Sequence, residues 1–165
     1  MMKKPRPGRA AVASLLEQID EAYDRRSWHG TNLRGALRGV TVDQAAWRPA
    51  PGRHDIWEIV LHAAYWKYAV WRRLTGEKRG TFARTGSNWF PTPTPPTEAR
   101  WRADVKLLGE CHRDLREAVA DLSDADLGRR AAGGKEAVGG LVRGIAAHDL
   151  YHAGQVQLLK RLLRA

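Results

Sequence analysis

The segment that decides the fold class is Asp55–Gly76, which reads DIWEIVLHAAYWKYAVWRRLTG. Apolar residues recur along it at α-helical spacing, and a second apolar set lies on the other side. The Asp55 side chain can accept a backbone N–H at the start of this helix, Glu58 follows three residues on, and Thr75 and Gly76 end it. A helix that is apolar nearly all round must be covered from several directions, so the segment predicts packing among several helices.

Three further segments have helical periodicity, namely 10–38, in which Gly30 could disturb the helix, 98–122 and 141–163. None has the sustained period of two that is typical of strands. Thr41 and Gln44 predict a capping box between the first two helices, and 123–127 predicts a short capped turn. The proline-rich segment 77–96 predicts a long loop that packs through Trp89 and Phe90. We therefore expect an all-α four-helix bundle in a single domain, 1–165, with residues 1–9 as a flexible tail.

Length and composition narrow the class of protein. A chain of 165 residues with 43% hydrophobic residues and seven Trp can bury one core, and is not typical of a disordered protein. No apolar run approaches the roughly 20 residues that cross a bilayer, so we expect no membrane association and a cytoplasmic protein. Cys111 is the only cysteine, which excludes an internal disulfide and a thiolate-rich metal site. Any metal ion must bind imidazole nitrogen or oxygen.

The formal net charge of +10 favours weak attraction to polyanions. The excess is mostly arginine scattered around the predicted helices, without a dense basic block or a nucleic-acid-reading motif. We interpret it as a solvated surface and do not expect nucleic-acid binding. Exposed apolar residues on the flanks of the helices are compatible with a homodimer.

Two histidines carry the strongest functional signal. His148 and His152 are four residues apart within the apolar stripe of 141–163, so both rings can reach one point on the same helix face. Each buried imidazole has two ring nitrogens that need partners, and a metal ion satisfies both rings at once. The alternative is a pair of core histidines bonded to protein groups.

His62 adds a third candidate ligand from another helix. It lies in 55–76, and bundle packing can bring that helix against 141–163. Three neutral imidazoles would hold one divalent ion and leave a coordination position open, as in a catalytic site. The alternative is a core histidine bonded to a backbone carbonyl.

The segments HDIWEIVLHAAYWKYAVWRRLTG (54–76) and GIAAHDLYHAGQVQLLKRL (144–162) resemble the two metal-site helices of the DinB/YfiT-like family of metalloenzymes. In that family one His of the second helix and the His-x-x-x-His of the last helix bind a divalent metal ion, commonly nickel or zinc. The matching positions are His62, His148 and His152. The resemblance covers most of the chain and implies a helical bundle with one bound metal ion.

The reaction that the resemblance implies is less defined. Some relatives are thiol-dependent transferases or isomerases that use a small intracellular thiol, and others are hydrolases. A three-histidine site can lower the pKa of bound water to about 7, or hold a substrate thiol as its thiolate. We therefore expect a metal-dependent hydrolase or small-thiol-dependent S-transferase that acts on a small molecule. The alternatives are a non-catalytic metal-binding or stress-response module and, more weakly, a basic nucleic-acid-associated protein.

The residues around the predicted ligands have weaker signals. Asp149 and Glu58 could each orient a ligand ring, or could pair with surface arginines, which is the preferred interpretation. Tyr151 and Gln155 are expected to face the pocket. His29 could contact substrate, or be a half-exposed structural histidine.

Two further residues are weighed as site residues and left out. His112 lies on the apolar seam of 98–122 and competes as a fourth ligand, but a single buried histidine is usually hydrogen-bonded and structural. Cys111 lies off that seam without an evident base to activate it, so we do not expect a catalytic nucleophile.

Overall fold

The computed structural model describes residues 8–164. In this part of the chain the regular elements are helical: α1 (Ala10–Tyr23), α2 (Leu33–Ala36), α3 (Val42–Ala46), α4 (Ile56–Thr75), α5 (Glu98–Ala120), the 3-10 helix η1 (Asp124–Gly128) and α6 (Val138–Leu162). The only β pairing there is an isolated bridge between Arg130 and Ala137. The all-α prediction is confirmed. Among these helices, none is long and apolar enough to cross a membrane.

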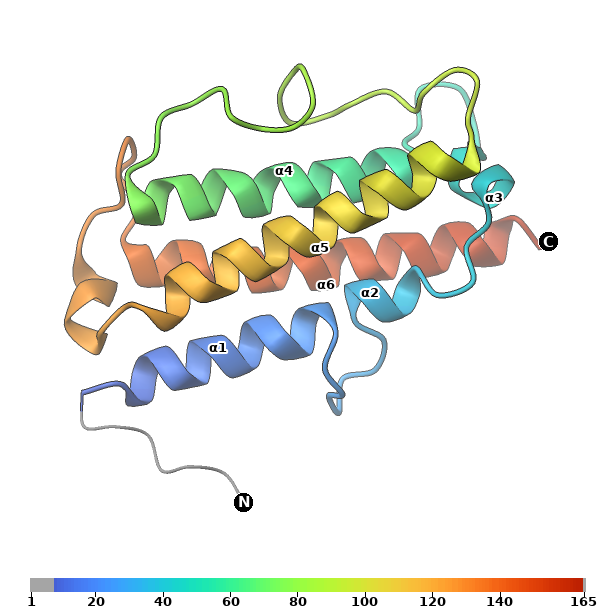
Figure 1. The fold of residues 1–165 in the computed structure, drawn as a ribbon. Coiled ribbons are helices and arrows are strands. Elements are labelled where there is room, and N and C mark those ends of the chain that lie inside the picture. The colour runs from blue at the N-terminus through green and yellow to red at the C-terminus, as the bar shows by residue number, and fades with distance from the viewer. Residues whose placement is uncertain (1–7, 165) are drawn as a thin grey trace.

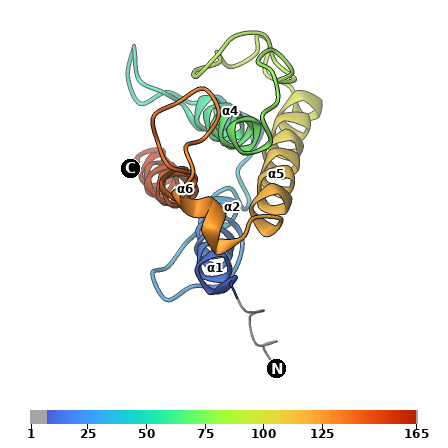
Figure 2. The same cartoon turned by 90° about the vertical axis from the view of Figure 1, so that its left-hand side faces the viewer.

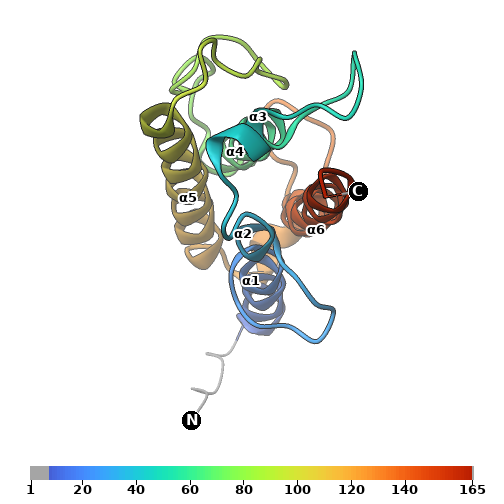
Figure 3. The same cartoon turned by 90° about the vertical axis from the view of Figure 1, so that its right-hand side faces the viewer.

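The four long helices lie side by side. Figures 2 and 3 look along them and show α1, α5, α4 and α6 arranged in a ring. In agreement, α4 contacts α5 and α6, and α1 contacts the same two helices. This arrangement is compatible with the predicted four-helix bundle. In Figure 1, α1 and α6 run in one direction and α4 and α5 in the other, so the long loop after α4 returns along the molecule before α5 begins.

The predicted helix 10–38 is wrong as one continuous helix, because the disturbance expected at Gly30 is a full interruption between Tyr23 and Leu33. The chain leaves α1 after Tyr23 and starts a new short helix, α2, at Leu33. Asn32 causes the new start, because its side-chain oxygen accepts from the backbone N–H of Gly35 at 2.8 Å while its amide donates to the carbonyl of Arg25 at 2.7 Å. Both the oxygen and the NH2 group of the Asn32 amide thus have backbone partners. These local hydrogen bonds favour a new helix start over continuation of α1, despite the helical spacing of the apolar residues.

The other predicted boundaries are close to the structure. Asp55 caps α4 through the backbone N–H of Glu58, and Gly76 ends it with φ of 80°, which a residue without Cβ adopts without strain. The predicted capping box of Thr41 and Gln44 is present at α3. Helix α6 begins at Val138, three residues before the prediction. Arg9, at the end of the predicted tail, donates to the carbonyls of Ala120 and Leu122, whereas residues 1–7 lie outside the described part.

The interior consists of two apolar clusters, one at each end of the ring of helices. One gathers Trp57, Leu33 and Leu108 with the packed loop residue Phe90, and the other gathers Ile19, Leu115 and Val142. Helix α4 is buried along most of its length, as its sequence predicts. It carries an unexpected buried residue, Lys67, whose exposed fraction is 0%.

Candidate metal centre

Three histidines from two helices meet at one point. His62 comes from α4, and His148 and His152 come from successive turns of α6. The Nε2 atom of His148 lies 3.1 Å from Nε2 of His62 and 3.1 Å from Nε2 of His152. One ligand atom from each ring lies within 4.8 Å of the others, so the group could hold a metal ion.

The far nitrogens of two of these rings have fixed acceptors. Nδ1 of His62 donates to the backbone carbonyl of Asn88 at 2.8 Å, and Nδ1 of His152 donates to Oε1 of Gln155 at 2.7 Å. Because the proton of each neutral ring is on Nδ1, the lone pair of each Nε2 points into the group. Nε2 of His148 can donate to only one of them. A cation is therefore the partner that satisfies all three nitrogens together.

The geometry fits a divalent ion. Zinc binds imidazole nitrogen at about 2.0–2.1 Å, which places neighbouring ligand nitrogens about 2.8–3.0 Å apart in octahedral and about 3.3–3.4 Å apart in tetrahedral coordination. The two Nε2 separations of 3.1 Å lie between these two values, as the separations of ligands to one ion should. Three imidazoles without a thiolate suit zinc or nickel better than calcium or magnesium, which prefer oxygen ligands.

Burial keeps the three rings uncharged. Desolvation lowers the pKa of His62, lowers that of His148 to about 3 with help from its two histidine neighbours, and lowers that of His152 to about 4. Metal ligation requires the neutral ring. The protein surroundings thus hold all three side chains in the form that binds metal at neutral pH.

His148 differs from the other two ligands. Its Nδ1 atom is buried and has no hydrogen-bond partner among the described residues. Metal-ligating histidines nearly always donate their second N–H to a fixed acceptor. The orientation of His148 therefore depends on its position between His62 and His152 and on the nearby Trp66 ring, 6.3 Å away between centroids.

The loop between α4 and α5 covers one side of the group. Trp89 stacks on His62 with ring centroids 3.8 Å apart, and His54 stacks on the outer face of Trp89 at 3.5 Å. Asn88 has φ of 65°, and its side-chain oxygen accepts from Nε1 of Trp66 at 2.9 Å. The predicted packing of this loop is confirmed, and it delivers the carbonyl that orients His62.

Of the other predicted site residues, two lie at the histidine group and two lie away from it. Gln155 bonds His152, and its amide donates to the hydroxyl of Tyr151, whose side chain is 64% exposed at the edge of the group. His29 is exposed in the segment between α1 and α2 and is not part of the histidine group. His112 is buried beside Lys67 and is not part of the histidine group, as expected from the sequence.

Neither predicted carboxylate orients a ligand ring. Glu58 pairs with Arg48 and with Nδ1 of His54, so the ion-pair interpretation holds for it. Asp149 is 1% exposed and pairs with Lys67 inside the bundle. The surface-arginine interpretation of Asp149 was wrong, because a lysine from α4 extends into the core to meet it.

A small apolar cavity adjoins the group between α4 and α6. It has a volume of about 290 Å³ and extends from His148 along Trp66 and Val70 to Ile145, with Arg73 near one end. This space can hold a nonpolar group of a small molecule next to His148, the member of the histidine group that lines it.

Comparison with known proteins agrees with this architecture. The family model described as the DinB superfamily matches residues 25–156, which include α2 to α5 and all three histidines. No curated protein and no solved structure matches the chain. Since the match spans most of the sequence, the chain belongs to the DinB superfamily.

Proposed function

We propose that this protein is a metal-dependent enzyme, a hydrolase or a small-thiol-dependent S-transferase, with one zinc or nickel ion bound by His62, His148 and His152. The observation that carries the proposal is the convergence of three Nε2 atoms, two of which must present lone pairs because their Nδ1 protons are donated to Asn88 and Gln155. Bound there, a divalent ion acts as a Lewis acid that lowers the pKa of a water or thiol ligand.

An incomplete ligand set favours catalysis over storage. Among residues 8–164, no fourth His, Cys, Asp or Glu joins the three histidines. Three protein ligands leave at least one position for water or substrate, whereas structural sites fill all four positions with protein. The same feature distinguishes the proposal from a module that only stores or senses metal.

The residues around the group have separate roles in this proposal. Asn88 and Gln155 orient two ligand rings, and Trp89 excludes water from the face of His62. The apolar cavity beside His148 binds the nonpolar part of a small substrate. Tyr151, which is exposed and whose ring lies beside that of His152, contacts the substrate in this proposal.

Elemental analysis tests the metal and its ligands together. Protein purified without a nickel column is expected to contain about one zinc or nickel ion per chain, and the His62→Ala, His148→Ala, His152→Ala triple variant none. His29→Ala is the matched control, because His29 is exposed and outside the group, and should retain the ion. Equal metal content in the triple variant and the parent protein would refute the proposal.

Cobalt substitution tests the open position. Co(II) in the site should show d–d absorption typical of four or five ligands, and 2-mercaptoethanol should add a thiolate-to-cobalt charge-transfer band if the enzyme uses a thiol. A site that binds thiol supports the S-transferase, and one that responds to pH but not to thiol supports the hydrolase. A six-coordinate spectrum that neither thiol nor pH alters would contradict a catalytic role.

A further inference from the structure

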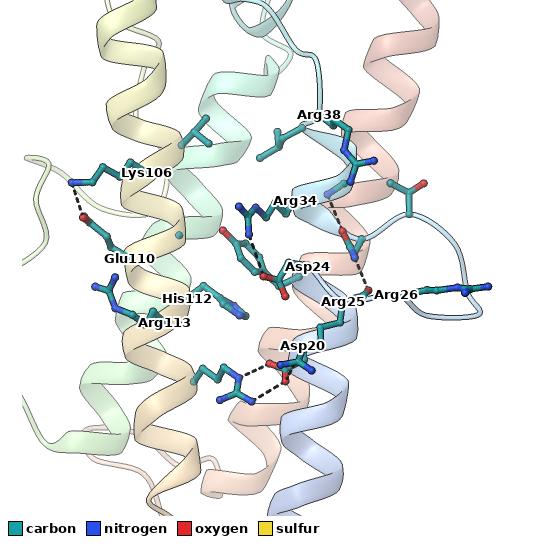
Figure 4. Close-up of a pocket in the computed structure, with 18 of the residues that line it drawn as sticks. Asp20, Asp24, Arg25, Arg26, Arg34, Arg38, Lys106, Glu110, His112 and Arg113 are labelled. Carbon is teal, nitrogen blue, oxygen red and sulfur yellow. Dashed lines mark hydrogen bonds and ion pairs between the residues drawn. The ribbon is translucent and has the colours of Figure 1, made fainter. Parts of the chain in front are cut away.

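A second, larger cavity lies on another side of the molecule. It has a volume of about 1540 Å³ and is bounded by α1, α2, the segment between them and α5. Figure 4 shows its side chains projecting from α5 on one side and from α1 and α2 on the other. None of the three histidines of the candidate metal centre lines it. The family assignment and the proposed reaction leave this cavity without a role.

The cavity lining is strongly cationic. Eight of its residues are Arg or Lys and four are Asp or Glu. Each of the four acids is paired with a cation of the lining, for example Asp20 with Arg116 and Asp24 with Arg34. Arg38 forms no ion pair with a described residue, and Arg113 pairs only with Asp114, outside the lining. The positive excess is therefore available to a ligand.

Two buried side chains add hydrogen-bond donors to the cavity wall. The rings of Tyr23 (5% exposed) and His112 (6% exposed) stack with centroids 3.7 Å apart, and both residues line the cavity. The Tyr23 hydroxyl has no hydrogen-bond partner among the described residues, and burial raises its pKa, so it stays protonated. Gly109 leaves the space next to this hydroxyl open, because a Cβ added there would lie 3.5 Å from it.

The tautomer of His112 makes it a donor as well. Nζ of Lys67 lies 3.4 Å from Nδ1 of His112 and donates to it, since an ammonium group has no lone pair. Burial, with Lys67 next in effect, lowers the pKa of His112 to about 2 and keeps the ring neutral. The single ring proton is therefore on Nε2, which has no partner among residues 8–164. Figure 4 shows His112 pointing from α5 toward α1 across the cavity.

We propose that this cavity binds a small organic anion, attracted by the positive charges of Arg38 and Arg113 that no lining carboxylate offsets, with the Tyr23 hydroxyl and His112 Nε2–H donating to its phosphate or carboxylate group. Unbalanced positive charge around a cavity raises the local concentration of an anion and favours its binding. Leu37, Trp101 and Val105 supply an apolar wall, so the ligand carries a nonpolar or aromatic body beside its charge. The volume accommodates a molecule of nucleotide size.

Calorimetric titration of the full-length protein with 1-naphthyl phosphate tests the proposal, with uncharged 1-naphthol as the comparison ligand. We expect one binding event for the phosphate and at least about tenfold weaker binding of 1-naphthol. The Arg38→Glu, Arg113→Glu double variant should weaken phosphate binding at least about tenfold. The matched control is Arg79→Glu, Arg143→Glu, which makes the same charge change at exposed residues outside the lining and should keep the affinity.

Two further variants probe the cavity interior without altering its charge. Tyr23→Phe removes only an unpaired hydroxyl and should weaken phosphate binding about 3- to 30-fold, as for one hydrogen bond to a charged group. Gly109→Leu fills the space beside that hydroxyl and should abolish binding, while the larger side chain favours helix α5. Thermal unfolding confirms that each variant is folded.

The site is separated from the candidate metal centre by His152→Ala, which should leave the affinity for 1-naphthyl phosphate unchanged. The proposal is overturned if the phosphate does not bind at millimolar concentration or if 1-naphthol binds equally well. Equal loss in the two arginine double variants would also overturn it, because the effect would then come from net charge alone. Loss of binding in His152→Ala would place the phosphate at the histidine group instead.

Discussion

The ion pair between Lys67 and Asp149 lies fully inside the bundle, so substitutions of these residues should change the free energy of unfolding strongly. Lys67 is 0% exposed and Asp149 is 1% exposed. Asp149 bonds Lys67 through Oδ2, and its Oδ1 has no partner among the described residues. Nζ of Lys67 also contacts Nδ1 of His112 and lies 4.8 Å above the Tyr23 ring. Removing either charge leaves the other buried without its counter-ion.

Each single substitution should therefore be costly. Lys67→Met leaves Asp149 without a hydrogen-bond partner and should lower the free energy of unfolding by about 3–5 kcal/mol. Asp149→Leu removes the counter-ion of Lys67 and should cost a similar amount, although Lys67 keeps its contacts with His112 and Tyr23. The Lys67→Met, Asp149→Leu double variant removes both charges and should lie within about 2 kcal/mol of the parent protein, or above it.

Urea unfolding in the presence of a chelator, followed by circular dichroism, measures these values at constant m-value. Burial raises the pKa of Asp149, and Lys67 opposes the rise, so Lys67→Met should raise it further. A carboxyl group with a raised folded-state pKa stabilises the fold at low pH and loses this contribution as pH rises through that pKa. The loss caused by Lys67→Met should thus be smaller near pH 4 than at pH 7.

Comparison of the double variant with the two single variants tests whether Lys67 and Asp149 depend on each other. The destabilisation of the double variant should be smaller than the sum of the single ones by at least about 3 kcal/mol. If each single substitution costs less than about 1 kcal/mol, or if the double variant equals the sum, then the pair is not the buried, mutually dependent contact described here. The double variant should also bind metal more weakly than the parent protein, because its two helices lose a fixed register.

Three further predictions concern the histidine group. Gln155→Leu removes the acceptor of His152 and should lower zinc affinity about 10- to 100-fold in competition with a chromophoric chelator; unchanged affinity would contradict the orienting role. Asn88→Gly keeps the positive φ and should bind zinc better than Asn88→Ala, where the same φ is strained and the carbonyl that orients His62 shifts. The unfolding free energy of the metal-free protein should fall as pH drops from about 6.5 to 4. The pKa values of His148 and His152 are lower in the folded protein than in the unfolded chain, so in this range the unfolded chain binds more protons and is favoured as pH falls. Denaturation at several pH values checks this, and a variant with all three histidines replaced by Ala should show a shallower slope.

The features that sequence predicts well are those governed by local periodicity. The convergence of His148 and His152 follows from their i, i+4 spacing on one face of an amphipathic helix. The capping boxes and the end of α4 at Gly76 follow from residue types whose backbone preferences are strong. His62 is different, because α4 is apolar nearly all round and periodicity does not say which side faces α6. The family resemblance supplied that choice.

The features that escaped prediction depend on partners distant in sequence. Asn88 orients His62 through its backbone carbonyl, which any residue possesses, so its residue type is consistent with its positive φ but does not reveal the contact with His62. Asn32 broke the predicted first helix because its amide reaches back to Arg25. Lys67 was not singled out, although a lysine near the middle of a largely apolar helix indicates a buried charge. A buried ammonium group needs an anion nearby, and Asp149 is the acidic residue beside the apolar stripe of α6.

That pair also links the stability of the bundle to the geometry of its site. Lys67 follows His62 by five residues on α4, and Asp149 directly follows His148 on α6, so two contacts between the same helices lie little more than one turn apart. Apolar packing alone tolerates small sliding of one helix along another, whereas a buried ion pair requires close approach of two particular atoms. A shift of α4 by one turn would break the ion pair and carry His62 about 5.4 Å away from His148. The cost of separating Lys67 from Asp149 therefore restrains the spacing of the histidine nitrogens, which gives the bundle a physical reason to bury a charge beside residues that must meet at one ion.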